Sequence, residues 1–183
     1  MMSATTEPGP GARLDHDHFA LFGLPPRFQQ DRGAIDHVWR ELQAKVHPDR
    51  YAAGSPTERR IAMQWASRVN EAHRVLRSPL LRARYLCELA GQPVQDENNT
   101  AMAPAFLMQQ LEWREAIEAA RQAADAAAFE RIETELGDAR RALVATVAQA
   151  LDGEPRDLPA AVARVREWMF LERLLEEIDT HRP

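Results

Sequence analysis

The chain has 183 residues, which suffice for one large domain or two small ones. Apolar residues make up 45% of the chain, a share that excludes an intrinsically disordered protein. A single cysteine, Cys87, excludes an intramolecular disulfide and a CxxC metal site. No apolar run approaches the roughly 18 residues of a membrane-spanning helix, and the N-terminus lacks the apolar core of a signal peptide. We therefore expect a cytoplasmic protein that does not bind a membrane.

The net charge of −5 is divided unevenly along the chain. Residues 27–84 carry 12 Arg or Lys against 6 Asp or Glu, a net charge of +6. Residues 101–183 carry 10 Arg or Lys against 16 Asp or Glu, a net charge of −6. A basic half and an acidic half suggest two surfaces for two different partners, although ordinary surface variation would give a similar division.

The pattern of the chain is helical throughout, which predicts an all-α fold. Residues 1–14 are rich in Gly, Pro and small polar residues and are typical of a flexible tail. A short apolar segment follows over residues 19–24 and ends at Pro25-Pro26. Asp31 is then expected to cap a helix with one buried stripe. The apolar positions of that stripe are Ile35, Val38, Trp39, Leu42 and Val46.

Pro48 should end this helix, because proline lacks an N–H group and disfavours helical angles at the preceding residue. The sequence Ser55-Pro56-Thr57-Glu58 predicts the start of the next helix, with Ser55 as cap and Glu58 completing a capping box. Its buried positions are expected at Ile61, Trp65, Val69, Ala72 and Leu76. A further helix over residues 80–90 should end at Gly91.

The polar, turn-rich residues 92–101 predict a linker between two domains. The first domain would cover residues 15–91. Three amphipathic segments with short connections follow, which predict a three-helix antiparallel bundle over residues 102–183.

The loop between the second and third predicted helices contains His47, Pro48 and Asp49. Proline keeps this tripeptide extended, so that less conformational freedom is lost on docking. Asp49 can accept a bidentate bond from an arginine of a partner. Three cations lie close by in the sequence: Arg40, Lys45 and Arg50. The same helix also carries Asp36 and Glu41, which reduce its positive charge. An ordinary turn that ends a helix is the alternative interpretation.

A His-Pro-Asp tripeptide between a basic second helix and a capped third helix resembles the signature of J-domains. The resemblance implies that His47, Pro48 and Asp49 dock on a heat-shock chaperone and stimulate its ATP hydrolysis. It also implies electrostatic contacts to that chaperone from the three cations named above.

The segment 105–119 carries apolar residues on two faces. At about 100° per residue, Phe106, Trp113, Ile117 and Ala120 fall on one side, which we expect to be the core. Leu107, Met108 and Leu111 fall on roughly the opposite side, together with Glu112 and Glu115. A second apolar face rimmed by carboxylates predicts a partner surface, unless it packs on the first domain.

Residues 106–115, together with residues 19–25 and 79–86, resemble the HscB family of iron–sulfur cluster assembly co-chaperones. The resemblance implies a non-enzymatic protein without a cofactor. It would stimulate the ATPase of an HscA- or DnaK-type chaperone and deliver an IscU-type scaffold protein to it. The residues that match the family's scaffold-binding pattern are Leu107, Met108, Leu111, Glu112, Glu115 and Phe170. Position 119 is Ala where that pattern has an acid.

Three alternatives stay open at this point. The chain could be a general J-domain co-chaperone for another client. The basic half could bind nucleic acid, with an affinity that falls steeply as salt rises, although we expect no nucleic-acid partner. Residues 15–18, Asp-His-Asp-His, could bind a metal, although we expect none because they lack a helical His-x-x-x-His spacing.

Overall fold

The computed structural model describes residues 16–94 and 102–181, and all secondary structure within these ranges is helical. This confirms the predicted all-α fold. The predicted tail and most of the predicted linker lie outside the described residues. The chain divides into two compact units, residues 1–82 and residues 83–183, which are described separately below. The division falls inside a helix, so the domain limits 15–91 and 102–183 stay predictions from the sequence.

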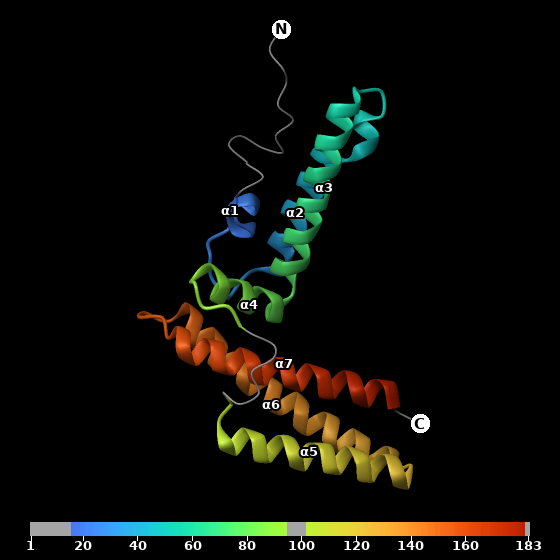
Figure 1. Ribbon diagram of the computed structural model, residues 1–183, viewed down its shortest axis with the longest axis vertical. Helices are drawn as coiled ribbons and strands as arrows, with labels where there is room; N and C mark the ends of the chain where they lie inside the picture. Colours follow the sequence, from blue (N-terminus) through green and yellow to red (C-terminus); the bar gives the residue numbers. More distant parts are fainter. Residues whose placement is uncertain (1–15, 95–101, 182–183) are drawn as a thin grey trace. The chain divides into compact units, whose positions relative to one another are not determined.

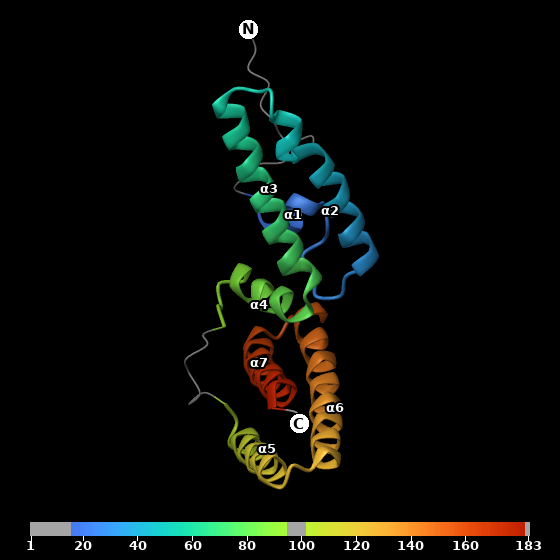
Figure 2. The same ribbon diagram turned by 90° about the vertical axis from the view of Figure 1, so that its right-hand side faces the viewer.

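The first unit is built on a helical hairpin. The long helices α2 (Arg32–Val46) and α3 (Pro56–Arg77) run antiparallel, and the short helix α1 (His18–Phe22) contacts both (Figures 1 and 2). A 3₁₀ turn, η1 (Pro48–Tyr51), joins the two long helices, and α4 (Pro79–Leu89) follows α3.

Helices α2 and α3 begin, and α2 ends, where the sequence predicts. Asp31 accepts a hydrogen bond from the Gly33 amide at 2.8 Å and begins α2. Ser55 and Glu58 form a capping box at the start of α3, with 2.7 Å between the Ser55 amide and the Glu58 carboxylate. Helix α2 ends at Val46, two residues before Pro48. The caps thereby satisfy amides that have no partner within their own helix.

The core of the first unit consists of one apolar stripe from each helix. Leu42, Trp65 and Val69 are among the predicted positions that are buried. Two arginines tie the connecting segments to this core. Arg68 of α3 donates to the His16 carbonyl at 2.8 Å, and the buried Arg82 donates to the Phe28 carbonyl at 2.7 Å. The short helix α1 and the segment before α2 are thus held by charge-assisted bonds as well as by apolar contacts.

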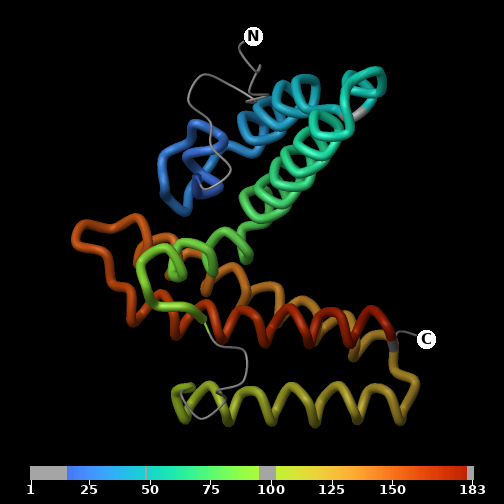
Figure 3. Tube along the Cα trace, turned by 45° about the horizontal axis from the view of Figure 1, so that its top comes forward, coloured from blue at the N-terminus to red at the C-terminus, as the bar shows by residue number. Residues whose placement is uncertain are grey.

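The second unit contains α5 (Pro104–Ala123), α6 (Ala126–Asp152) and α7 (Leu158–His181). Helix α6 runs antiparallel to both of its neighbours, and α5 lies along the pair that α6 and α7 form (Figure 3). The buried cluster draws on all three helices: Trp113, Ile117, Ala120, Phe129, Ile132, Leu136, Phe170, Leu171, Leu174 and Ile178. The indole Nε1 of Trp113 donates to the Glu135 carboxylate at 2.8 Å and so links α5 to α6. The described part of the chain has no helix with the length and hydrophobicity to span a membrane.

His18 of α1 is a titratable group in the core of the first unit. Its side chain is only 5% exposed. Burial, followed by the nearby positive charge of Arg68, lowers the pKa of His18 from 6.5 to about 4. The imidazole is therefore neutral in the folded protein at pH 7.

This burial predicts that the first unit loses stability as the pH falls from 6.5 to 4. The unfolded chain binds a proton at His18 in this range while the folded chain does not, so acid favours unfolding. We expect a loss of roughly 2 kcal/mol between pH 7 and about 4.5 from this group. Hydrogen exchange of the α1 to α3 amides measures it. The variant His18→Asn should flatten the pH dependence, whereas His37→Asn, at an exposed position of α2, should leave it unchanged.

Candidate functional site

The turn after α2 presents two polar side chains to solvent. His47 caps the C-terminal end of α2 with ψ at 127°, which turns the chain out of the helix. The side chains of His47 and Asp49 are 55% and 89% exposed. The Nδ1 atom of His47 accepts a hydrogen bond from the Asp49 amide at 3.3 Å and lies 3.5 Å from the Asp49 carboxylate. The ring therefore braces the turn through Nδ1.

The two residues after this tripeptide fold back onto the helix that they follow. Arg50 donates to the Ala44 carbonyl at 2.7 Å, and the Tyr51 hydroxyl donates to the Lys45 carbonyl at 3.1 Å. Both carbonyls belong to the last turn of α2, where no later helical amide can reach them. Arg50, predicted as an electrostatic contact, thus also fastens the turn. Tyr51 is not among the residues that the sequence predicts for this site, although side chains can bond the last carbonyls of a helix.

The charge on the outer face of α2 depends on where its two carboxylates lie. Arg40 and Lys45 are exposed, as is Glu41, which lies 3.4 Å from His37 on the same helix. Asp36 instead lies toward α3, where its side chain is 28% exposed. One of the two carboxylates that reduce the positive charge of α2 is therefore compensated within the hairpin.

The compensation comes from a polar cluster between α2 and α3. One oxygen of Asp36 accepts hydrogen bonds from His73 at 2.7 Å and from Arg77 at 2.9 Å. The bond from His73, and then that from Arg77, lowers the pKa of Asp36. Trp39 stacks on His73 with 4.7 Å between ring centroids and donates to Asn70 at 3.1 Å. These contacts fix the two helices against each other near the start of α2 and the end of α3.

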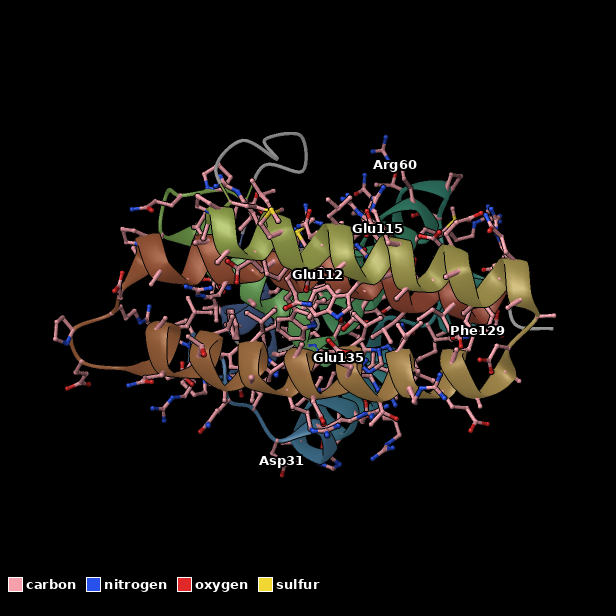
Figure 4. All side chains as sticks on the ribbon, turned by 90° about the horizontal axis from the view of Figure 1, so that it is seen from below. Asp31, Arg60, Glu112, Glu115, Phe129 and Glu135 are labelled. Atoms are coloured by element: carbon pink, nitrogen blue, oxygen red, sulfur yellow. The ribbon has the colours of Figure 1, made fainter. Side chains whose placement is uncertain are left out.

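The second candidate surface lies on the outer face of α5. We define the α5 patch as Leu107, Met108, Leu111, Glu112 and Glu115. The three apolar members are 39%, 61% and 51% exposed, and both carboxylates are exposed. The opposite face of the helix is buried or half-buried, as the periodicity predicts. Figure 4 shows Glu112 and Glu115 on α5 and Glu135 on the facing side of α6.

Phe170 lies apart from this exposed surface. It is 6% exposed and belongs to the core stripe of α7, which repeats at Leu171, Leu174 and Ile178. Its ring meets that of Phe106 edge to face at 6.0 Å between centroids, and the guanidinium of Arg114 lies 5.5 Å above it. The structure thus differs from the aromatic surface contact that the resemblance implied, because α7 turns this ring toward α5.

The side chains considered for metal binding or thiol chemistry are engaged in other contacts or buried. Asp17 accepts from the Ala20 amide at 2.9 Å and caps α1, and His18 is buried. Asp15 lies outside the described residues. Within the described ranges, no three His, Cys, Asp or Glu side chains are grouped so that they could hold a metal ion. Cys87 is buried, and burial raises the pKa of its thiol, as expected of an inert side chain.

Comparisons with known proteins place these surfaces in a family context. Residues 102–179 match the family described as the HSCB C-terminal oligomerisation domain. The chain is 58% identical to the co-chaperone protein HscB homolog of Bordetella petrii, over 91% of this chain and 96% of that protein. The structure of chaperone HscB from Vibrio cholerae matches with a TM-score of 0.79 and 32% identity, over 90% of this chain and 96% of that one. Human co-chaperone protein HscB matches with a TM-score of 0.86 and 25% identity, over 95% of this chain and 84% of that one.

The fastening of the turn predicts a local effect of Arg50→Ala. Losing the bond to the Ala44 carbonyl should cost about 1 kcal/mol of local stability, because a carbonyl of the last helical turn loses its donor. We expect the amides of residues 46–51 to exchange roughly fivefold faster. Arg40→Ala is the matched control, since it removes an exposed arginine from α2 itself. Equal exchange in both variants would show that Arg50 does not hold the turn.

Proposed function

Because the chain belongs to the HscB family of co-chaperones, we propose that it stimulates ATP hydrolysis by a heat-shock chaperone of the HscA or DnaK type and delivers an iron–sulfur scaffold protein of the IscU type to it. Its relatives are co-chaperones, proteins that act through the activity of another protein. The observation that carries the proposal is the exposed His47 and Asp49 pair on a turn that Arg50 and Tyr51 fasten to α2.

In the proposed contact, the exposed turn after α2 docks on the chaperone as a rigid segment. A docking segment loses less conformational entropy when its bound shape already exists. Asp49, at 89% exposure, offers a carboxylate that can accept two bonds from one arginine. Pro48 begins the 3₁₀ turn and sets the backbone direction between its neighbours. Long-range attraction to an acidic surface would come from Arg40, Lys45 and Arg50.

The proposed contact with the scaffold uses the α5 patch. Three partly exposed apolar side chains at one place on a helix form the kind of surface that a partner covers. Leucine and methionine adapt to the contours of a partner, and a carboxylate rim selects one with nearby cations. Phe170 would contribute indirectly, because its ring packs against that of Phe106 in the first turn of α5.

The two contacts together would make the chain a tether. The proposed J-domain over residues 15–91 would hold the chaperone, and the proposed bundle over residues 102–183 would hold the scaffold. Simultaneous binding raises the effective concentration of the scaffold at the substrate site of the chaperone. Stimulated ATP hydrolysis would then fix the chaperone on its client, which aids cluster assembly and transfer.

The proposal predicts that Asp49→Asn abolishes ATPase stimulation and leaves scaffold binding intact. The amide cannot replace a charged acceptor for a partner arginine, so stimulation should fall about tenfold or more. A steady-state ATPase assay of the chaperone measures it. Glu41→Gln is the control, because it removes an exposed carboxylate from α2 outside the turn. Full stimulation by the Asp49 variant would remove the turn from the mechanism.

The converse variant, Leu107→Ala with Leu111→Ala, should lose scaffold binding and keep basal ATPase stimulation. Removing two apolar anchors should weaken binding roughly thirtyfold. Calorimetric titration with the scaffold measures this affinity. Met63→Ala, which truncates a 56% exposed methionine on α3, is the matched control. Should each of the two variant chains lose both activities, the division of the chain into two binding sites would be wrong.

A further inference from the structure

A hollow opens in the bundle where the first half of α5 faces the second half of α6. Its volume is about 460 Å³, within the range of sites that hold small organic molecules. All three helices of the second unit line it, with Phe106 and Trp113 on α5, Ala142 and Leu143 on α6, and Glu167 on α7. No residue of the α5 patch lines the hollow, so the two surfaces are separate.

The wall of the hollow on α5 is aromatic and held in place. The rings of Phe106 and Trp113 meet edge to face with 6.1 Å between their centroids. The indole of Trp113 is fixed by its bond to the Glu135 carboxylate, at 2.8 Å. On α6 the lining includes the small side chains of Ala139 and Ala142. These small residues leave the space open, because packed helices otherwise fill such gaps with longer side chains.

On α7 a buried carboxylate keeps one oxygen without a partner. Glu167 is 2% exposed, and its Oε2 atom accepts a hydrogen bond from Arg164 at 2.6 Å. Within the described residues its Oε1 atom accepts no hydrogen bond. Sealed side-chain atoms that lack a partner occur, in the same residues, only on His18, Arg68 and Arg166, so Oε1 is not sealed. Because Glu167 lines the hollow, this oxygen can accept a bond from a molecule bound there.

The charge around the hollow favours a cation. Within the described residues its lining holds one guanidinium, that of Arg164, which is already paired with the buried carboxylate. Two further carboxylates bond lining side chains that are neutral donors. Glu135 bonds the indole of Trp113, and Glu112 bonds the amide of Gln109 at 3.0 Å. Neutral donors leave the negative charge of both carboxylates in place, and aromatic ring faces also attract cations.

We propose that this hollow binds a small organic cation, whose apolar body packs on Phe106 and Trp113 and whose charged head donates to Glu167. Burial of the body removes apolar surface from water, and the head completes a carboxylate that the fold leaves half-satisfied. An anion of the same shape meets the surrounding carboxylates and is disfavoured. A ligand of about nine non-hydrogen atoms should bind with a dissociation constant of roughly 1 mM. The site does not depend on the function proposed above.

Titration of the chain with phenethylammonium chloride, followed by NMR, tests the site. The indole N–H resonance of Trp113 should shift and saturate at millimolar concentrations, whereas that of Trp39, in the first unit, should not move. Phenylpropionate, an anion of similar size, should bind at least roughly tenfold more weakly. Equal affinity for the two compounds, or no saturable shift of the Trp113 resonance up to about 30 mM, overturns the proposal.

Variants of the lining assign the binding to the hollow. Ala142→Leu fills the hollow and should abolish binding, whereas Ala145→Leu, at an exposed position of α6 outside the lining, should leave it unchanged. Glu167→Gln keeps the size of the side chain and removes its charge, so the affinity should fall roughly tenfold. If Glu167→Gln unfolds the bundle, the two alanine variants still decide, because both alanines are exposed. Unchanged binding by Ala142→Leu contradicts the proposal.

Discussion

The described helices each bury one apolar stripe in their own unit. This constraint decides which apolar side chains stay exposed and can contact a partner. A helix in a hairpin or a three-helix bundle needs only about a third of its circumference to contact its neighbours. In α2 and α3 the stripe repeats at three and four residues, and nearly all apolar side chains of these helices follow it. In α5 the stripe is complete with Trp113, Ile117 and Ala120, yet Leu107, Met108 and Leu111 lie outside it. The surplus apolar surface of α5 is therefore left partly exposed in its own unit.

The hairpin of the first unit shows how a small exposed motif is given a fixed shape. The side chains of His47 and Asp49 are exposed, and the geometry of the turn comes from the residues around it. Arg50 and Tyr51 bind carbonyls at the end of α2, and the cluster around Asp36 and His73 locks α2 to α3. Because these bonds are between parts of the hairpin, the exposed His47 and Asp49 side chains keep their position without being buried.

The second unit combines a tightly packed pair of helices with a more lightly attached third. Helix α5 is held by its core stripe, by the bond from Trp113 to Glu135, and by the ring of Phe106 against Phe170. Its outer face is partly exposed at Leu107, Met108 and Leu111. Three partly exposed apolar side chains suit a partner that binds weakly and dissociates readily.

The amino-acid sequence by itself determined the all-α fold, the start of α3 at Ser55, the end of α2 before Pro48 and the two faces of α5. Those features follow from local chemistry: a missing N–H group, a side-chain cap, and a repeat of about 3.6 residues. The resemblance of short motifs to the HscB family was confirmed by identity over most of the chain.

Only the tertiary structure decided which side chains are held by residues far away in the chain. Asp36 could not be assigned to His73 and Arg77 from the sequence, because these residues are 37 and 41 positions away and meet it only when α2 and α3 pair. Phe170 lies in the core for the same reason, since the rotation of α7 against α5 is set by the packing of the whole bundle. Local signals determine where helices begin and end, whereas the contacts between helices depend on a mutual fit that no single segment encodes.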